Sequence, residues 1–497
     1  MTAAADAPDA SASLPLGPDR ANLHPSASSK RFDTSREEAS KRPGRTTTRN
    51  TTTVLVTTKG VPTMARMTRR TAALAAVATL SVAGLALSGC AGGDTSGGDG
   101  DTLRLWHYEG ADSAMGKAWA EAIKVFEEET GATVEFEEKS FEQIQKTASQ
   151  VLDTDAAPDL MEFNKGNATA GFLASTGLIA DISDAVDEYG WDDKLAPSLQ
   201  TTAKYTEDGV MGGDTWYGIP NYGEFVGVYY NLDAFEEAGL EIPTTYDEFV
   251  DVLDAFVEQG VTPLAEAGAE YPLGQLWYQL ALSQADRSFV DDYQLYENPV
   301  DWSGPEVTYA TETLADYVDK GYIAKDVSSV KAEDAGVSFI NGTSPIFVSG
   351  SWWYGRFVAE ATDFEWTMGA FPESTLSLGS SGNLWVVPAN AANAELAYEF
   401  IDITMRPEIQ AIIGNNGGVP VAADAADITD EKSAALIETF NGILDDDGLS
   451  FYPDWPAPGF YDVLVQELQG LVTGAQDAAA TATNLGEQYD EGTADYR

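Results

Sequence analysis

The amino-acid sequence predicts an α/β fold built on a parallel sheet with helical crossovers. Between residues 102 and 163, short apolar segments alternate with segments of helical periodicity, in the order strand, helix, strand, helix, strand. This order is typical of parallel strands that are joined by helices. The chain has 497 residues, of which 43% are hydrophobic and 10% aromatic. Such a chain can bury a large core, and its length favours two domains.

The first elements follow from local patterns. Apolar and polar residues alternate over 102–106, which predicts a strand. Over 114–130 apolar residues recur every three or four positions, which predicts a helix, and Gly131 is a suitable residue to end it. The next expected elements are a strand over 133–137, a helix over roughly 141–153 and, after the turn at Pro158 and Asp159, a strand over 160–163.

The rest of the chain continues in the same mixed style. Asn231 is expected to open a short helix, and residues 245–259 form an amphipathic helix with Phe249, Val252 and Phe256 on one face. Helices are expected to dominate from residue 392 onward. Short apolar strands are expected over 226–230, 344–348 and 384–388.

The segment around Cys90 predicts export from the cytoplasm. Arg69 and Arg70 precede an apolar stretch over 71–87, which is the layout of a secretory signal. The run 87–90, Leu-Ser-Gly-Cys, resembles the bacterial lipobox. The resemblance implies cleavage before Cys90, a lipid on its sulfur and an extracellular, membrane-anchored protein. The alternative is an ordinary buried cysteine.

The amino-terminal region divides into three parts. Residues 1–66 are rich in Ser, Thr, Pro and Arg, so we expect a disordered segment or a mis-called extension upstream of the true start. Residues 67–89 are the expected lipoprotein signal peptide. Residues 90–100, rich in Gly, Asp and Ser, are expected to be a flexible tether.

Composition excludes several classes of function. Residues 1–89 hold 12 of the 28 basic and 6 of the 80 acidic groups, which leaves 16 basic and 74 acidic groups beyond them. This surface repels phosphate, so nucleic acid is not an expected partner. Cys90 is the only cysteine and His107 the only histidine after residue 24, so we expect no disulfide and no multi-histidine metal site. No catalytic motif is present, and no cofactor is expected.

Several motifs together resemble one family. They are Leu105-Trp106-His107-Tyr108, the segment 126–134, Pro158-Asp159-Leu160, the segment 176–181, Gly218-Ile219-Pro220 with Tyr229-Tyr230-Asn231, Gly350-Ser351-Trp352, and the segment 383–388. In this order they resemble the extracellular solute-binding lipoproteins of carbohydrate ABC importers, in the broad maltose-binding class. The resemblance covers residues 101 to 470.

The resemblance implies a two-lobed, type II periplasmic-binding-protein-like fold with a ligand cleft and a hinge between the lobes. We expect an N-terminal lobe of residues 101–212 plus about 329–380, and a C-terminal lobe of about 213–328 plus 381–497. The implied function is capture of a sugar, an oligosaccharide in our interpretation, and its delivery to ABC permease subunits by a monomeric protein that is not an enzyme. The alternatives are a secreted carbohydrate-active enzyme and a polysaccharide-binding surface lipoprotein.

Residues at the ends of the expected strands are the candidate sugar-binding residues. Sugars offer C–H faces that stack on aromatic rings and hydroxyls that bond to carboxylates and amides. The family's loops after the strands, together with this chemistry, suggest Trp106, His107, Glu109, Asn164, Tyr222, Glu224, Trp277, Trp352, Asn383, Trp385 and Trp455. Core packing is the alternative for Trp106 and Trp352, and a solvated loop is the alternative for His107 and Glu109.

Overall fold

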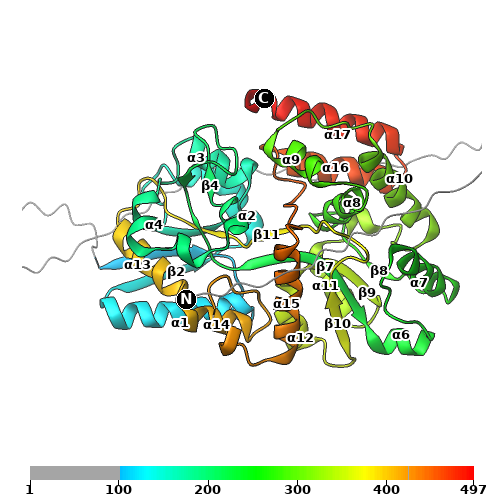
Figure 1. The fold of residues 1–497 in the computed structure, drawn as a ribbon, viewed down its shortest axis with the longest axis horizontal. Coiled ribbons are helices and arrows are strands. Elements are labelled where there is room, and N and C mark those ends of the chain that lie inside the picture. Colours follow the sequence, from blue (N-terminus) through cyan, green and yellow to red (C-terminus); the bar gives the residue numbers. More distant parts are fainter. Residues whose placement is uncertain (1–100, 424) are drawn as a thin grey trace, which may run out of the picture. The chain divides into compact units, whose positions relative to one another are not determined.

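The computed structural model describes residues 101–423 and 425–497, which belong to one compact unit of the chain. Two five-stranded sheets, each covered by helices, are found among these residues, and they form the two lobes seen to the left and right of helix α15 (Glu431–Asp445) in Figure 1. The expected signal peptide, tether and Cys90 lie outside the described residues. No helix in the described ranges is long and apolar enough to cross a membrane.

The first lobe is built on a five-stranded sheet with the order β2-β1-β3-β12-β6. Strand β1 is parallel to β2 and β3, whereas β12 is antiparallel to β3 and β6. The strands are β1 (Thr102–His107), β2 (Thr133–Glu138), β3 (Leu160–Phe163), β6 (Ile219–Pro220) and β12 (Leu384–Val386). The helices are α1 (Ala114–Thr130), α2 (Phe141–Val151), α3 (Phe172–Ser175), α4 (Ser183–Tyr189), α5 (Pro197–Gln200), α13 (Ala394–Thr404) and α14 (Pro407–Gly414), and a small ribbon pairs β4 (Lys204–Tyr205) with β5 (Thr215–Trp216).

The second lobe is built on a sheet with the order β10-β7-β9-β8, in which β11 also pairs with β7. The strands are β7 (Gly223–Asn231), β8 (Leu264–Ala265), β9 (Ile346–Gly350), β10 (Trp366–Gly369) and β11 (Gly379–Ser381). The helices are α6 (Leu232–Ala238), α7 (Tyr246–Glu258), α8 (Pro272–Leu282), α9 (Arg287–Leu295), α10 (Pro305–Lys320), α11 (Ala332–Ile340), α12 (Tyr354–Glu360), α15, α16 (Phe460–Val472) and α17 (Ala478–Gly492).

Local signals explain why the predicted helices form where they do. The Ser113 hydroxyl accepts a hydrogen bond from the Gly116 amide and opens α1, and Gly131, at φ 72°, ends it. Thr245 and Glu248 form a reciprocal capping box at the start of α7. Such caps supply partners for amides that the helix itself cannot satisfy. The predicted helices over 114–130 and 245–259 are therefore confirmed.

The predicted division between lobes is wrong for three segments. The shortest is β6, which was expected in the C-terminal lobe of about 213–328 but pairs with β12 in the first sheet. We assigned 329–380 to the N-terminal lobe, but β9 pairs with β7 in the second sheet. We assigned residues from 381 onward to the C-terminal lobe, but β12 pairs with β3 in the first sheet. Strands β9 and β12 are short and fully buried, so their sequences carry no preference for one sheet over the other.

The chain passes between the lobes at a ribbon of two antiparallel segments. Strands β6 and β7 run one way, and β11 and β12 run back beside them. The amide of Asn221 donates to the carbonyl oxygen of Asn383 at 3.0 Å where the two crossings meet. A third crossing joins α14 to α15, and Gly223 bridges to Val419 there. These crossings form the hinge that the family resemblance implied.

Candidate functional site

A cavity of about 500 Å³ lies beside the hinge ribbon and is lined by residues of both lobes. First-lobe residues come from the loops after β1, β2 and β3, and second-lobe residues come from α8, the β9–α12 junction and the loop before α16. The lining residues are Tyr108, Glu109, Ser140, Phe141, Glu142, Asn164, Lys165, Tyr222, Glu224, Glu270, Tyr271, Gln275, Glu333, Trp352, Asn383, Tyr452, Asp454, Trp455 and Tyr461.

The structure brings seven of the eleven candidate residues together at this cavity. They are Glu109, Asn164, Tyr222, Glu224, Trp352, Asn383 and Trp455. In the sequence they are spread over almost 350 positions, so their convergence depends on both crossings of the hinge. Their role in binding remains a prediction. Trp106, His107, Trp277 and Trp385 do not line the cavity.

Trp277 and Trp385 are core residues, and both are 0% exposed. Trp277 lies on α8, all of whose residues are buried, and its ring stacks on that of Trp302. Trp385 lies in β12, where its ring packs against Trp119 and Phe400 at centroid distances of 5.1 and 5.7 Å. Both were candidate sugar-binding residues, and the structure instead packs them in the core, away from the cavity.

His107 and Trp106 flank the cavity without lining it. The His107 ring stacks on Phe136 at 4.0 Å, and its Nδ1 accepts a hydrogen bond from the Glu109 amide at 3.2 Å. Burial lowers the pKa of His107 to about 4, so the ring is neutral near pH 7. The Trp106 ring lies under the Lys139 ammonium at 4.1 Å. His107 thus supports the loop that carries Glu109.

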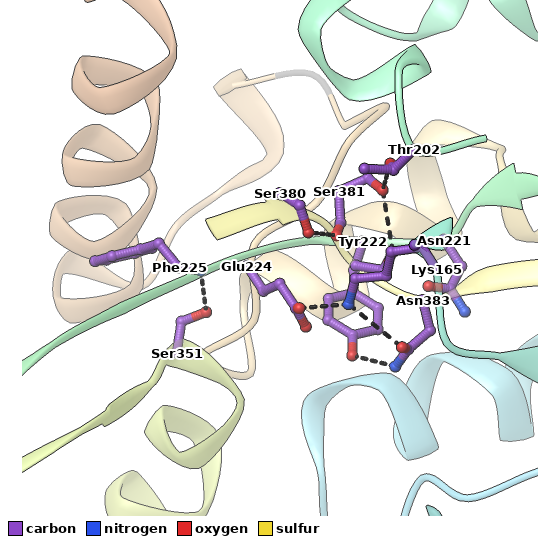
Figure 2. Close-up of polar contacts among 12 residues, drawn as sticks. Lys165, Thr202, Asn221, Tyr222, Glu224, Phe225, Ser351, Ser380, Ser381 and Asn383 are labelled. Carbon is purple, nitrogen blue, oxygen red and sulfur yellow. Dashed lines mark hydrogen bonds and ion pairs between the residues drawn. The ribbon is translucent and has the colours of Figure 1, made fainter. Parts of the chain in front are cut away.

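Four side chains form what we call the polar floor of the cavity: Lys165, Tyr222, Glu224 and Asn383. Lys165 Nζ contacts Glu224 Oε1 in an ion pair whose side chains are 3% and 6% exposed. The same ammonium donates to Asn383 Oδ1 at 3.4 Å, and Asn383 Nδ2 donates to the Tyr222 hydroxyl at 2.7 Å. Figure 2 shows Lys165 between the Glu224 and Asn383 side chains. The polar floor therefore connects the loop after β3 to both strands of the hinge.

A second layer of polar residues holds the floor in place. Asn221 Nδ2 donates to Glu162 Oε1 at 3.0 Å, and the Asn221 carbonyl oxygen accepts from Gln410 Nε2 at 3.0 Å. The hydroxyls of Thr202 and Ser381 lie 2.5 Å apart. Because each of these contacts joins a hinge segment to another part of the chain, the hinge ribbon has a defined position under the cavity.

Four aromatic residues form what we call the aromatic wall: Tyr271, Trp352, Tyr452 and Trp455. Ring centroids are 6.1 Å apart for Tyr271 and Trp352, 6.3 Å for Trp352 and Tyr452, and 5.1 Å for Tyr452 and Trp455. Lys165 Nζ lies 5.4 Å from the Tyr452 ring and 5.5 Å from the Trp455 ring. The wall and the floor therefore meet at this ammonium.

Glycines allow the rings to lie close to the backbone. A Cβ atom on Gly350 would stand 1.9 Å from the Trp352 ring, and one on Gly166 would stand 2.5 Å from the Trp455 ring. Gly166 also has φ 110°, a conformation that favours glycine. The two tryptophan positions thus depend on glycines of different segments.

Burial changes the ionisation of the cavity carboxyl groups. Burial is the main cause that raises the pKa of Glu109 to about 7, and the Ser113 hydroxyl and Lys165 oppose the shift. Burial likewise raises the pKa of Asp454 to about 6. The pKa of Glu162, which is 0% exposed, is raised well above its usual range by burial and then by Glu109. Carboxyl groups in such surroundings gain from a positively charged or hydrogen-bond-donating partner.

Contacts between the lobes also surround the cavity. The Ala168 amide donates to the Trp455 carbonyl oxygen at 2.8 Å, and Asn167 Nδ2 donates to the Tyr296 hydroxyl at 2.8 Å. The Tyr461 hydroxyl donates to Glu142 Oε1 at 3.1 Å. These bonds join the loop after β3 and helix α2 to the second lobe, so the two lobes contact each other across the cavity.

Sequence reasoning missed several lining residues. Tyr452 and Asp454 lie in the same Pro-rich loop as Trp455, so that loop could have been considered as a whole. Lys165 is absent from the candidate residues, because its partner Glu224 is 59 positions away and the sequence gives no local sign of their pairing. Tyr271 and Gln275 lie at the start of a helix and have no local signal that marks them as lining residues.

Comparison with known proteins identifies the family. Residues 121–439 match the model of a family described as bacterial extracellular solute-binding protein. The match covers more than half of the chain, so this protein belongs to the bacterial extracellular solute-binding proteins. The family resemblance found in the sequence is confirmed.

Individual relatives of this protein have diverged widely from it in sequence. The diacetylchitobiose binding protein DasA of Streptomyces coelicolor is 27% identical over 371 residues, which cover 72% of this chain and 82% of that protein. The multiple sugar-binding protein of Streptococcus mutans is 25% identical over 228 residues, which cover 44% of this chain and 54% of that protein.

Solved structures share the fold. A chitin oligosaccharide binding protein superposes with a TM-score of 0.68 at 23% identity, covering 80% of this chain and all of that chain. The GacH receptor of Streptomyces glaucescens superposes with a TM-score of 0.63 at 19% identity, covering 80% of this chain and 99% of that chain. These likenesses confirm the predicted two-lobed α/β fold.

Proposed function

We propose that this protein captures an oligosaccharide in the cavity between its lobes and delivers it to the permease subunits of an ABC importer. The observation that carries this proposal is the meeting of the aromatic wall and the polar floor in one cavity. Aromatic rings stack on the C–H faces of sugars, and carboxylates and amides bond to their hydroxyls. The names of the relatives give further support, since DasA is described as binding diacetylchitobiose and GacH as forming a complex with acarbose.

Capture would proceed by closure of the lobes on the sugar. A ligand shifts a two-state equilibrium only if it binds one state better than the other. Glu109 and Asn164 lie on the first lobe and Trp352 and Trp455 on the second, so a sugar that contacts both sets favours the closed state. The hinge ribbon provides the segments at which backbone rotation would occur. One chain is sufficient for this action.

The rival functions have less support. A carbohydrate-active enzyme would also present aromatic rings and carboxyl groups, but the family to which the chain belongs is one of binding proteins. A surface lipoprotein that holds a polysaccharide would need an open groove. The cavity here is flanked by contacts between the lobes, which suits a short ligand instead.

The lipid anchor is part of the proposal. The lipobox-like run that ends at Cys90 would attach the protein to the outer face of the cell membrane, close to the permease. Two acyl chains anchor a protein stably, whereas one does not. Cys90→Ser is therefore expected to abolish lipidation and release the protein from the membrane or leave it uncleaved. Unchanged lipidation and membrane association of this variant would contradict the anchor.

A thermal-shift screen tests sugar capture. A ligand that binds only the folded protein at about a hundredfold excess over its dissociation constant stabilises the protein by roughly 2.7 kcal/mol. We expect at least one mono- or oligosaccharide in a broad panel to raise the melting temperature. If peptides or metal ions raise it and no sugar does, the proposed function is wrong.

A further inference from the structure

The carboxyl groups around the cavity outnumber the cations available to them. Three lining carboxylates have partners at the rim: Glu142 pairs with Lys146, Glu270 with Lys331 and Glu333 with Arg356. Four other carboxyl groups, those of Glu109, Glu162, Glu224 and Asp454, share one cation, Lys165. Lys165 is also the only Lys or Arg that lines the cavity within the described residues.

This imbalance is costly inside a protein. A buried charge is stable only if it is paired and hydrogen-bonded, and Lys165 is already paired with Glu224. His107 adjoins Glu109 but is neutral, since its pKa is lowered to about 4 by burial. The pKa values of Glu109 and Asp454 are raised, mainly by burial. In the part of the chain that the structure describes, no second positive charge is available to these groups.

The same cavity holds buried polar atoms that have no partner within the described residues. The Oε1 atom of Gln275, a residue that is 6% exposed, accepts no hydrogen bond, and the Tyr108 hydroxyl is also unpartnered. Both residues line the cavity. An unpartnered polar group is stabilised when a ligand supplies the missing hydrogen bond. The acidic cluster is therefore part of a site that is built to contact a polar ligand.

The aromatic wall adds to the preference for a cation. The faces of Tyr452 and Trp455 already lie within 5.4 and 5.5 Å of the Lys165 ammonium. Ring faces carry negative electrostatic potential and attract organic ammonium groups. An anionic sugar would instead place like charges together in a desolvated site, which is unfavourable.

We propose that the sugar bound in this cavity is cationic, an amino sugar whose protonated amine lies among Glu109, Glu224 and Asp454. This inference rests on the proposed function, because it names the class of sugar that the same cavity would take. The amine would supply the second positive charge. The remaining ring faces and hydroxyls of the sugar would use the aromatic wall and the amide groups of Asn164 and Gln275.

A set of three matched sugars tests the inference. The probes are the β-1,4-linked disaccharide of glucosamine, its N-acetylated form and cellobiose, which carry an amine, a neutral amide and a hydroxyl at the same positions. Calorimetric titration of the full chain is expected to show the amine form binding at least about tenfold more tightly than either neutral form. The preference should persist at about 0.5 M salt, because buried pairs are little screened.

Variants separate the cavity from the overall negative charge of the chain. Asp454→Asn keeps the size of the side chain and removes one cavity carboxylate, so the preference for the amine form should fall about tenfold. Asp187→Asn, on the exposed face of α4, removes the same charge far from the cavity and should keep the full preference. Melting curves of both variants establish that they are folded.

The possible results distinguish this inference from the proposed function. Equal or tighter binding of a neutral form would overturn the amino-sugar inference and leave sugar capture intact. The inference also fails if none of the three probes binds but another neutral sugar raises the melting temperature, or if the amine preference is lost equally in Asp187→Asn. If Ca²⁺ or Mg²⁺ alone raises the melting temperature and no sugar does, both proposals fail.

Discussion

The polar floor and the aromatic wall line the same cavity but are held in different ways. Each floor residue is bonded to another floor residue, and the bonds join the loop after β3 to both hinge strands. The wall residues pack against one another, and Trp352 and Trp455 also lie against glycines. If the cavity binds the proposed sugar, we expect changes in the floor to affect stability and the position of the lobes as well as binding. We expect changes in the wall to affect mainly affinity.

The largest effect is expected from breaking the ion pair of the floor. Lys165→Met leaves the Glu224 carboxylate buried without its cation, which typically costs about 3–5 kcal/mol. Chemical denaturation should therefore show a large loss in the free energy of unfolding. A loss below about 1 kcal/mol would mean that water reaches Glu224, as it does for surface pairs.

A double variant provides the control for this prediction. Lys165→Met combined with Glu224→Gln removes both charges, so no unpaired charge is left in the floor. We expect the double variant to recover most of the lost stability, because neutral replacement of a buried pair is often tolerated. If the double variant is as unstable as the single one, packing of the Lys165 side chain rather than its charge stabilises the floor.

The next effect contrasts a tryptophan of the wall with one of the core. Trp352 is half-buried and lines the cavity, so Trp352→Ala should weaken sugar binding by a few kcal/mol, as expected for an aromatic anchor. The loss in melting temperature caused by Trp352→Ala should be smaller than the loss caused by the core variant Trp385→Ala. Trp385 is fully buried between Trp119 and Phe400, so Trp385→Ala should cost about 3–5 kcal/mol of stability.

Measurement of both quantities for both variants tests the contrast. Affinity comes from titration with the sugar found in the thermal-shift screen, and stability comes from denaturation without sugar. Per folded molecule, Trp385→Ala should keep most of its affinity. A result in which Trp352→Ala loses stability and retains affinity would make the wall a part of the core.

A comparison of Trp352 and Trp455 with Trp385 shows what the sequence could predict. Trp352 follows Gly350 at the end of a strand, and Trp455 lies in a loop rich in proline, so both have local signals of a cavity position. Trp385 looked similar, next to Asn383 at the start of a strand. Because Leu384, Trp385 and Val386 are all buried, the alternation that normally separates two faces of a strand is absent there. Asn383 lines the cavity, whereas Trp385, two positions further along the chain, does not.

The same contrast holds for the fold: features that depend on neighbouring residues were predictable from the sequence, whereas features that depend on distant residues were not. The helix over 114–130 was predictable because Ser113 and Gly131 cap it. The sheet that receives a short buried strand depends on partners more than 100 positions away, as for β9 with β7 and β12 with β3. The pairing of Lys165 with Glu224 has the same character. Such partners are determined by the path of the chain through the hinge, and one sequence gives no direct sign of them.

The smallest expected effect is the pH dependence of stability caused by Glu109, a lining residue outside the floor and the wall that interacts electrostatically with Lys165 and Glu224 of the floor. Burial raises the pKa of Glu109 to about 7 from its usual 4.5, so the folded protein holds a proton that the unfolded chain has released between these values. Its contribution to stability is therefore fully present below about pH 4.5 and is lost as the pH rises through about 7. Glu109→Gln should remove this contribution, so between about pH 5 and pH 8 its melting temperature should fall less than that of the wild type, by on the order of 1 °C. Asp187→Asn is the control for the general loss of negative charge, and its melting temperature should follow the wild type. A Glu109→Gln profile parallel to that of the wild type would show that Glu109 is solvated and ionised throughout this range.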